Sequence, residues 1–205
     1  MFFFSSDVLQ NTFQTVSTIQ LIILHRRLFG ASAAVVRALG RRRERRRERR
    51  RERRGERRDN DNSTLLERVR ALATRVASAY AVDPERISLA GQSAGGVGAW
   101  RFALEYPEFL SAVVPVCGAL PGDSAKAAQR LKDLSIWVFH AADDSAMPVE
   151  LGDGAVAAMN RAGRREPARY TRYRRAPPPP DPQYNDMVGH ASYDLAFRDA
   201  SLYAW

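Results

Sequence analysis

The segment Gly91-Gln92-Ser93-Ala94-Gly95 places a serine hydroxyl between two glycines. A serine oxygen becomes an effective nucleophile when a base accepts its proton and a sharp turn exposes it, and such a turn needs neighbours without a Cβ atom. The pattern G-x-S-x-G is typical of a strand that turns directly into a helix. Ser93 is therefore the candidate nucleophile, although five such residues could also arise by chance in a glycine-rich loop.

A histidine must serve as the base, and the sequence has three, His25, His140 and His190. In strand–turn–helix sites of this kind, the acid and then the base follow the serine along the chain. Only His190 comes after both the serine and the acidic loop, so we expect His190 to accept the proton from Ser93. His140 ends an apolar segment and is interpreted as a structural residue.

The acid is expected in residues 141–148, which follow a predicted strand and contain two adjacent carboxylates, Asp143 and Asp144. Functional side chains gather at the carboxyl ends of the strands in parallel sheets, so this loop is well placed. Position alone does not choose between the two carboxylates. The helix behind Ser93 has free amide groups and a positive dipole at its start, and the Ala94 N–H is the expected donor to an oxyanion.

The elements that position these residues alternate between helix and strand from residue 63 onward, which is typical of a parallel α/β sheet. The patterns of apolar residues predict helices at 65–79, 97–106 and 149–162, and strands at 87–90, 112–117, 136–139 and 168–174. The four prolines at 177–180 predict an extended loop, because proline offers no N–H to a strand ladder.

The part of the chain before residue 63 has a different composition. Residues 1–40 are a poorly assignable apolar segment, in which residues 18–25 form either a buried strand or the end of a helix. Within the Arg/Glu-rich segment 41–62, residues 41–58 contain thirteen arginines and four glutamates, an excess that equals the net charge of +9 of the whole chain. We interpret 41–62 as a charged helix or a disordered segment without a core-facing side.

Composition also limits the kinds of partner and cofactor that we expect. The segment 41–62 has no aromatic residues between its arginines, so no specific nucleic-acid partner is expected. The single cysteine, Cys117, cannot form an internal disulfide and is interpreted as buried packing, and no Cys/His cluster has the spacing of a zinc site, so no metal or cofactor is expected. Neither a secretory signal nor a membrane-spanning stretch is recognised, which predicts a cytoplasmic location. The oligomeric state is not indicated.

Four blocks of the sequence resemble the esterase and prolyl-oligopeptidase-like α/β-hydrolases, a group that includes the phospholipase/carboxylesterase proteins. The blocks are V-D-P-E-R-I-S-L-A-G-Q-S-A-G-G-V-G-A-W (82–100), Y-P-E-F-L-S-A-V-V-P-V-C-G (106–118), F-H-A-A-D-D-S-A-M-P-V (139–149) and G-H-A-S-Y-D-L-A-F-R-D-A-S-L-Y-A-W (189–205). The third block is similar to the family's acid loop F-H-G-x-x-D-x-x-V-P, and alignment on His140 and Pro148 implies that Asp144 is the catalytic carboxylate. Ala141 replaces the usual glycine of that loop, and Tyr193 and Phe197 replace the usual Trp and Tyr of the last block.

The resemblance implies a partial α/β-hydrolase fold, with a mostly parallel sheet and flanking helices over residues 63–205. It also implies a serine hydrolase that cleaves carboxylic esters of small molecules through an acyl-enzyme, with Ser93, Asp144 and His190 as its triad. Two alternatives remain open. One is a serine peptidase of the prolyl-oligopeptidase-like type, and the other is an impaired hydrolase remnant with a basic interaction segment.

One part of the family's pattern is not found intact. The family has an earlier strand that ends in His-Gly-x-Gly, lies beside the nucleophile strand and provides the second amide of the oxyanion hole. The nearest candidate is residues 21–27, in which Arg26 stands where glycine is expected after His25. This run is a remnant of that strand, a coincidence or the product of an incorrect gene model. Loss of one oxyanion donor would lower the rate about 10²- to 10³-fold.

Overall fold

The computed structural model describes residues 19–23 and 62–205. The chain divides into two compact units, one formed by Met1–Leu24 with Ala77–Trp205 and the other by His25–Val76. Most of helix α2 (Asn62–Ala79) belongs to the second unit. The predictions for 1–40 and 41–62 therefore lie outside the described residues, apart from 19–23 and the first residue of α2. The first unit contains all four candidate site residues.

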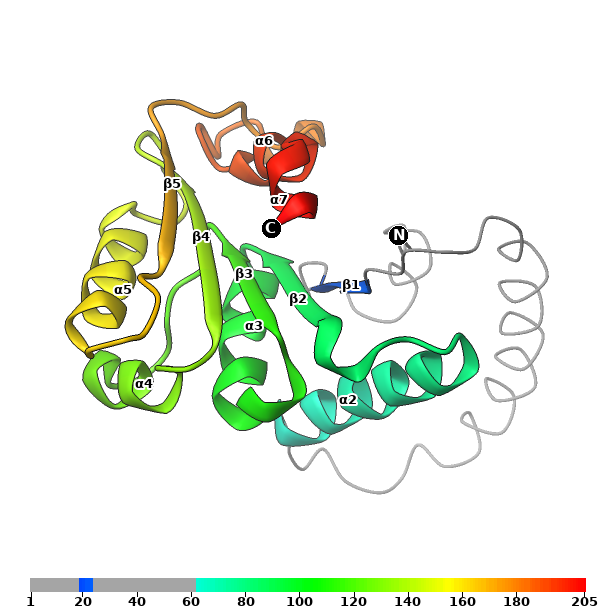
Figure 1. The fold of residues 1–205 in the computed structure, drawn as a ribbon. Coiled ribbons are helices and arrows are strands. Elements are labelled where there is room, and N and C mark those ends of the chain that lie inside the picture. The colour runs from blue at the N-terminus through cyan, green and yellow to red at the C-terminus, as the bar shows by residue number, and fades with distance from the viewer. Residues whose placement is uncertain (1–18, 24–61) are drawn as a thin grey trace, which may run out of the picture. The chain divides into compact units, whose positions relative to one another are not determined.

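A five-stranded sheet forms the centre of the first unit (Figure 1). Its strands follow the chain order: β1 (Ile19–Ile23), β2 (Ile87–Gln92), β3 (Ala112–Val116), β4 (Ser135–Ala141) and β5 (Arg169–Tyr173). Neighbours from β2 to β5 are parallel, whereas β1 pairs with β2 in the antiparallel direction. The four parallel strands overlap the four predicted ranges, and the α/β class is confirmed.

Helices connect the parallel strands and follow the last one. The connections are α3 (Ala94–Glu105), α4 (Ser124–Arg130) and α5 (Glu150–Arg161), and the chain continues after β5 with α6 (Ser192–Arg198) and α7 (Ala200–Ala204). Crossovers between parallel strands are right-handed, which places the three connecting helices on one side of the sheet, while α6 packs against β3 and β4. Short 3₁₀ turns occur at Pro84–Arg86, Pro107–Phe109 and Pro182–Tyr184.

Alternate residues of the strands form two apolar layers, because successive side chains of a strand point to opposite faces. One layer joins the strands to α6 and α7 through Ala90, Val114, Val116, Trp137, Phe139, Ala196 and Leu202. The other layer contains the neighbouring strand residues Leu89, Val113, Ile136 and Val138, all nearly inaccessible. Burial of one large apolar side chain stabilises a fold by about 1.5–3 kcal/mol. The two layers therefore fix the strand ends from which the site loops leave.

β1 lies beside β2, as the missing strand of the family would, but it has the opposite direction. Ile19 pairs with Gly91 and Ile23 pairs with Ile87. The end of β1 that leads toward His25 in the sequence is therefore next to the start of β2, while Ser93 follows the other end. This direction does not support the interpretation of residues 21–27 as a remnant oxyanion strand; His25 itself lies outside the described residues.

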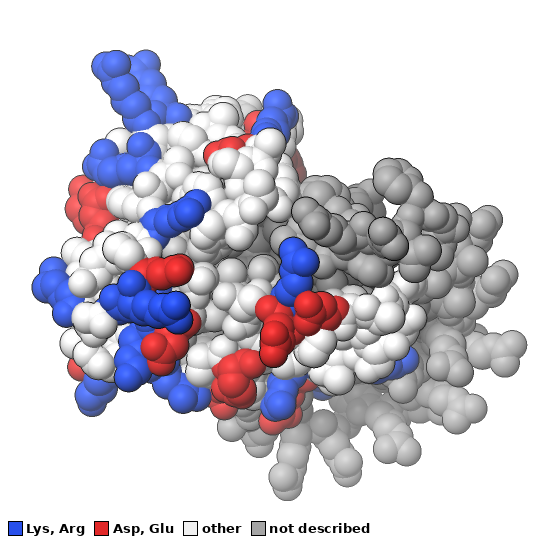
Figure 2. Space-filling view, viewed as in Figure 1, with Lys and Arg blue, Asp and Glu red and all other residues white. Residues whose placement is uncertain are grey.

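Acidic and basic side chains are interspersed over the face of the described residues that Figure 2 shows. The excess of arginine lies in residues 41–58, outside the described part of the chain. Among the described helices, none combines the length and the apolar character needed to cross a membrane.

Candidate active site

Ser93 occupies the turn between β2 and α3 in a strained backbone conformation. Its φ of 55° and ψ of −122° lie in a region that costs a non-glycine residue on the order of 1–3 kcal/mol. Gly91 makes the turn possible, because a Cβ atom there would collide with the carbonyl oxygen of Gly95. The Ser93 N–H donates to the carbonyl of Val116 at 2.9 Å and attaches the turn to β3. The sharp strand-to-helix turn predicted for Ser93 is therefore present.

Ala94 is the first residue of α3, where helix N–H groups have no acceptor within the helix. The first turn closes when the N–H of Val97 donates to the carbonyl of Ser93 at 3.1 Å. Ala94 itself is exposed. The Ala94 amide and the helix dipole can stabilise negative charge that develops next to the serine.

The three predicted triad residues are hydrogen-bonded in sequence. His190 Nε2 is 2.9 Å from Ser93 Oγ, and His190 Nδ1 is 3.0 Å from both carboxylate oxygens of Asp144. A carboxylate only accepts hydrogen bonds, so Nδ1 carries a proton and Nε2 of the neutral ring can accept the serine proton. His190 and Asp144 are 5% and 7% exposed, whereas Ser93 is half-buried.

The carboxylate of Asp144 is held by the loop that follows β4. Its Oδ1 accepts the backbone N–H groups of Ala146 and Met147 at 3.0 and 2.8 Å. Burial by itself would raise the pKa of Asp144, but hydrogen bonds from His140, His190 and the Met147 amide outweigh burial and hold the pKa well below its usual value. Asp144 is therefore ionised at neutral pH, as an acid that orients a histidine must be.

Asp143, the other candidate carboxylate, has a different partner. Its Oδ1 accepts the backbone N–H of Ala176, at 3.1 Å, in the segment that leads to the histidine loop. The structure thus places Asp144 against the His190 imidazole and Asp143 against backbone.

The segment between β5 and α6 that carries His190, the histidine loop, is joined by backbone contacts to the acid loop, which follows β4 and carries Asp144. The Ser145 N–H donates to the carbonyl of Val188 at 2.9 Å. Gly189 has a φ of +74°, and a Cβ atom there would collide with the carbonyl of Asp143. The glycine before His190 therefore allows the two loops to approach closely enough for the imidazole to reach Asp144.

Comparison with solved structures finds relatives with this arrangement of strands and helices. A thermostable esterase is 31% identical, with a TM-score of 0.57 over 69% of this chain and 36% of the esterase. A protein from Klebsiella pneumoniae assigned as a dienelactone hydrolase is 21% identical, with a TM-score of 0.53 over 70% of this chain and 61% of that protein. The chain belongs to the α/β-hydrolase superfamily.

The chain spans 36% of the length of the esterase and 61% of that of the Klebsiella protein. No family model matches the sequence, and no curated protein matches it. In the α/β-hydrolase fold, functional residues stand at the carboxyl ends of the strands. Ser93 follows β2 and Asp144 follows β4 at that end of this sheet.

One contact of this α/β-hydrolase site was not anticipated from the sequence. His140, interpreted above as structural, is completely buried, and its Nε2 lies 3.4 Å from Asp144 Oδ2. The feature of the sequence that could have indicated this contact is the spacing of four residues between His140 and Asp144.

Cys117 also lies close to the triad, at the end of β3. Its sulfur and the ligand atoms of Asp144 and His190 lie within 4.8 Å of one another. Burial raises the pKa of the Cys117 thiol to about 12, so the sulfur stays protonated and is a poor nucleophile and a poor metal ligand. Because Asp144 and His190 are also hydrogen-bonded to each other, we assign no metal ion to these three residues.

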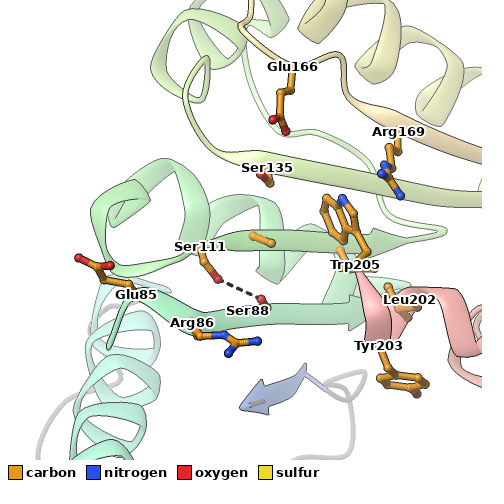
Figure 3. Close-up of a pocket in the computed structure, with 12 residues that line it drawn as sticks. Glu85, Arg86, Ser88, Ser111, Ser135, Glu166, Arg169, Leu202, Tyr203 and Trp205 are labelled. Carbon is orange, nitrogen blue, oxygen red and sulfur yellow. Dashed lines mark hydrogen bonds between the residues drawn. The ribbon is translucent and has the colours of Figure 1, made fainter. Parts of the chain in front are cut away.

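A cavity of about 450 Å³ lies at the opposite end of the sheet and does not include the triad (Figure 3). Its lining comes from the starts of the parallel strands and from Leu202, Tyr203 and Trp205 at the end of the chain, with Ser88, Ser111 and Ser135 among the residues drawn. Ser88 Oγ and Ser111 Oγ are hydrogen-bonded to each other at 3.2 Å. The cavity and Ser93 lie at opposite ends of the sheet, so a substrate bound in the cavity would not reach Ser93.

Proposed function

We propose that this protein is a serine hydrolase that cleaves carboxylic esters of small molecules through an acyl-enzyme. The observation that carries the proposal is the continuous hydrogen-bond chain from Ser93 through His190 to Asp144, with distances of 2.9 and 3.0 Å. The strained turn at Ser93 and the free amide of Ala94 support the same chemistry. The 31% identity with a thermostable esterase supports an ester as the substrate.

The reaction begins when Ser93 Oγ attacks the carbonyl carbon of the ester while its proton passes to His190 Nε2. The carbonyl oxygen becomes negative and accepts a hydrogen bond from the Ala94 N–H. Asp144 keeps the proton on Nδ1 and stabilises the imidazolium that forms. Collapse of the tetrahedral intermediate breaks the ester bond, and the departing alcohol takes the proton from Nε2. Water then hydrolyses the acyl group on Ser93, with His190 again as the base.

Hydrolysis of short p-nitrophenyl esters by the full chain tests the proposal. The parent protein should release p-nitrophenol at a rate proportional to protein concentration. Ser93→Ala should fall to background, a loss on the order of 10⁴-fold or more, because the variant cannot form an acyl-enzyme. Equal rates for the parent and for Ser93→Ala would show that the observed hydrolysis does not use this site.

The direction of β1 favours a second candidate, a hydrolase with weakened stabilisation of the oxyanion. The start of β2, and not Ser93, lies beside the end of β1 that leads toward His25. A site with one oxyanion donor in place of two would lose about 10²- to 10³-fold in rate. This candidate predicts normal modification of Ser93 by a fluorophosphonate together with slow ester turnover. Rapid turnover would contradict it.

Peptide hydrolysis and polyanion binding are the remaining alternatives from the sequence. The same triad can attack an amide, so parallel assays with an ester and with a proline-containing peptide of matched acyl group separate esterase from peptidase. Binding by the Arg/Glu segment would be salt-dependent and would disappear when residues 41–58 are deleted, because counterion release drives such binding.

A further inference from the structure

His140 is the next-to-last residue of β4, and its side chain is completely buried. Its Nε2 is 2.8 Å from the carbonyl oxygen of Met147 and 3.4 Å from Asp144 Oδ2. A carbonyl oxygen only accepts hydrogen bonds, so Nε2 must carry a hydrogen. One N–H group is therefore shared between the backbone of the acid loop and the carboxylate.

The two oxygens of Asp144 are supported in different ways. Oδ1 accepts the two loop amides of Ala146 and Met147. His190 Nδ1 is 3.0 Å from both oxygens, whereas His140 Nε2 lies 3.4 Å from Oδ2. His140 thus supports the oxygen that the two loop amides do not hold.

The surroundings of His140 lower the stability of the fold more than an apolar side chain that only fills space would. Its Nδ1 is buried and has no hydrogen-bond partner among the described residues, and such a group destabilises the folded state. Gly152 of α5 makes room for the ring, because a Cβ atom there would lie 2.7 Å from His140 Nδ1 and 3.1 Å from the Tyr170 hydroxyl. A glycine inside a helix also lowers the stability of the fold relative to alanine. A leucine or phenylalanine at position 140 would fill the space without burying a nitrogen that lacks a hydrogen-bond partner.

We propose that His140 is a positioning residue for the triad: its Nε2–H holds Asp144 Oδ2 in place for His190, and Gly152 provides the space that this imidazole needs. The inference rests on the function proposed above. His140 touches neither the substrate nor Ser93, and it transfers no proton. Its contribution is to keep the carboxylate ionised and aligned with His190 Nδ1, and its hydrogen bond is one of those that lower the pKa of Asp144.

Two substitutions of His140 separate positioning from packing. His140→Leu fills the space without a donor, whereas His140→Gln can place an N–H near the position of Nε2. We expect His140→Leu to lower kcat about 10- to 100-fold with little change in KM, because misplacement of a catalytic group by a fraction of an ångström to 1 Å has effects of this size. His140→Gln should restore a large part of the loss. A residue that acts only through packing would show no such rescue.

The pH profile of kcat/KM gives a second readout, since its acidic limb reports the base of the free enzyme. The titratable groups near the contact are Asp144, His190 and Cys117 at the strand ends and Tyr170 from β5. A less firmly held carboxylate stabilises the imidazolium of His190 less, so the acidic limb of His140→Leu should shift to lower pH. Loss of packing alone would leave the limb in place.

Two glycines of α5 provide a matched pair that leaves His140 unchanged. Gly152→Ala should push the imidazole away from Asp144 and lower kcat in the same way as His140→Leu. Gly154→Ala is the control, because nothing lies within 4 Å of its added Cβ. It should retain the parental kcat and gain stability from helix propensity. If His140→Leu does not fold, Gly152→Ala and His140→Gln decide the question.

The outcomes distinguish this role from the proposed function. A parent protein without Ser93-dependent hydrolysis overturns the proposed function and the role of His140 with it. A parent with Ser93-dependent hydrolysis, together with folded His140→Leu or Gly152→Ala variants of parental kcat and unshifted pH profile, overturns the role of His140 alone.

Discussion

The two ends of the parallel sheet carry similar residue types in different arrangements. At the carboxyl ends of the strands, Ser93 is hydrogen-bonded to His190, and His190 is hydrogen-bonded to Asp144. Where the strands begin, Ser88 and Ser111 line a cavity of about 450 Å³ together with arginine and glutamate side chains (Figure 3). Both ends therefore offer serine hydroxyls and carboxylates, and the cavity lies at the end without the triad.

The difference lies in the partners of the hydroxyl groups. At the start of the strands, Ser111 Oγ donates to the carbonyl of Ile87 at 3.0 Å and is 3.2 Å from Ser88 Oγ, and no histidine lines the cavity. At the other end, Ser93 lies in a strained turn, and its Oγ is 2.9 Å from His190 Nε2. The serine hydroxyls that line the cavity therefore lack the imidazole that lies beside Ser93.

The largest effect should come from the group that only one end possesses. His190→Gln removes the base and should lower kcat for a short p-nitrophenyl ester on the order of 10⁶-fold, as loss of the histidine does in other triads. Ser88→Ala, which removes a hydroxyl at the opposite end, should leave kcat within about twofold. A large loss in Ser88→Ala, measured in the same assay with folding checked by circular dichroism, would remove the distinction between the two ends.

The adjacent carboxylates Asp143 and Asp144 allow a second comparison, within one loop. Asp144→Asn keeps the shape of the side chain but loses the charge, and it should lower kcat about 10⁴-fold because the histidine is no longer held in the correct tautomer. Asp143→Asn can still accept the Ala176 N–H, so its kcat should stay within about tenfold and its stability within ~1 kcal/mol. Steady-state kinetics of the two variants in parallel provide the measurement, and equal losses would contradict the assignment of Asp144.

An intermediate effect is expected where the histidine loop approaches the acid loop. Gly189→Ala combines a φ of +74° with a collision against the Asp143 carbonyl, so it should lower kcat about 10- to 100-fold by moving His190. Gly163→Ala has a similar φ of +67° but meets nothing within 4 Å. It should cost only the backbone strain of about 1–2 kcal/mol and no activity. Similar kinetics for the two variants would mean that loop approach does not position His190.

The smallest effect concerns stability in acid. The lowered pKa of Asp144 means that its ionised form stabilises the folded state at pH values above the usual carboxyl value of 3.8, and that this stabilisation is lost as the pH falls toward the folded-state pKa. In urea unfolding, the stability difference between the parent and Asp144→Asn should therefore be larger at neutral pH than below pH 3. A difference that is independent of pH would contradict a lowered pKa.

The local parts of the fold could be predicted from the sequence, and the short helices could not. The parallel strands and the turn at Ser93 follow from apolar runs and glycine spacing. Helices α4, α6 and α7 have seven, seven and five residues, too few for a repeated apolar period. Two of them had another signal, since Asp123 accepts the N–H of Ala125 and Asp199 accepts that of Ser201 as N-cap residues.

Features that depend on distant pairing were beyond the sequence. The direction of β1 depends on how a five-residue strand meets β2, which its own residues do not specify. The choice of Asp144 over Asp143 came from family resemblance, because adjacent carboxylates have the same local pattern. The contact of His140 with Asp144 had only the spacing of four residues as a signal in the sequence, because it forms when the acid loop turns back toward the end of β4.

Modification of the full chain by a fluorophosphonate probe, with the adduct located by mass spectrometry, tests the hydrogen-bonded triad most directly. We expect one adduct, on the peptide that contains Ser93, absent in Ser93→Ala and strongly slowed in His190→Gln. A folded parent protein that forms no adduct at Ser93, or one whose labelling rate is unchanged in His190→Gln, would contradict the role of Ser93 as an activated nucleophile.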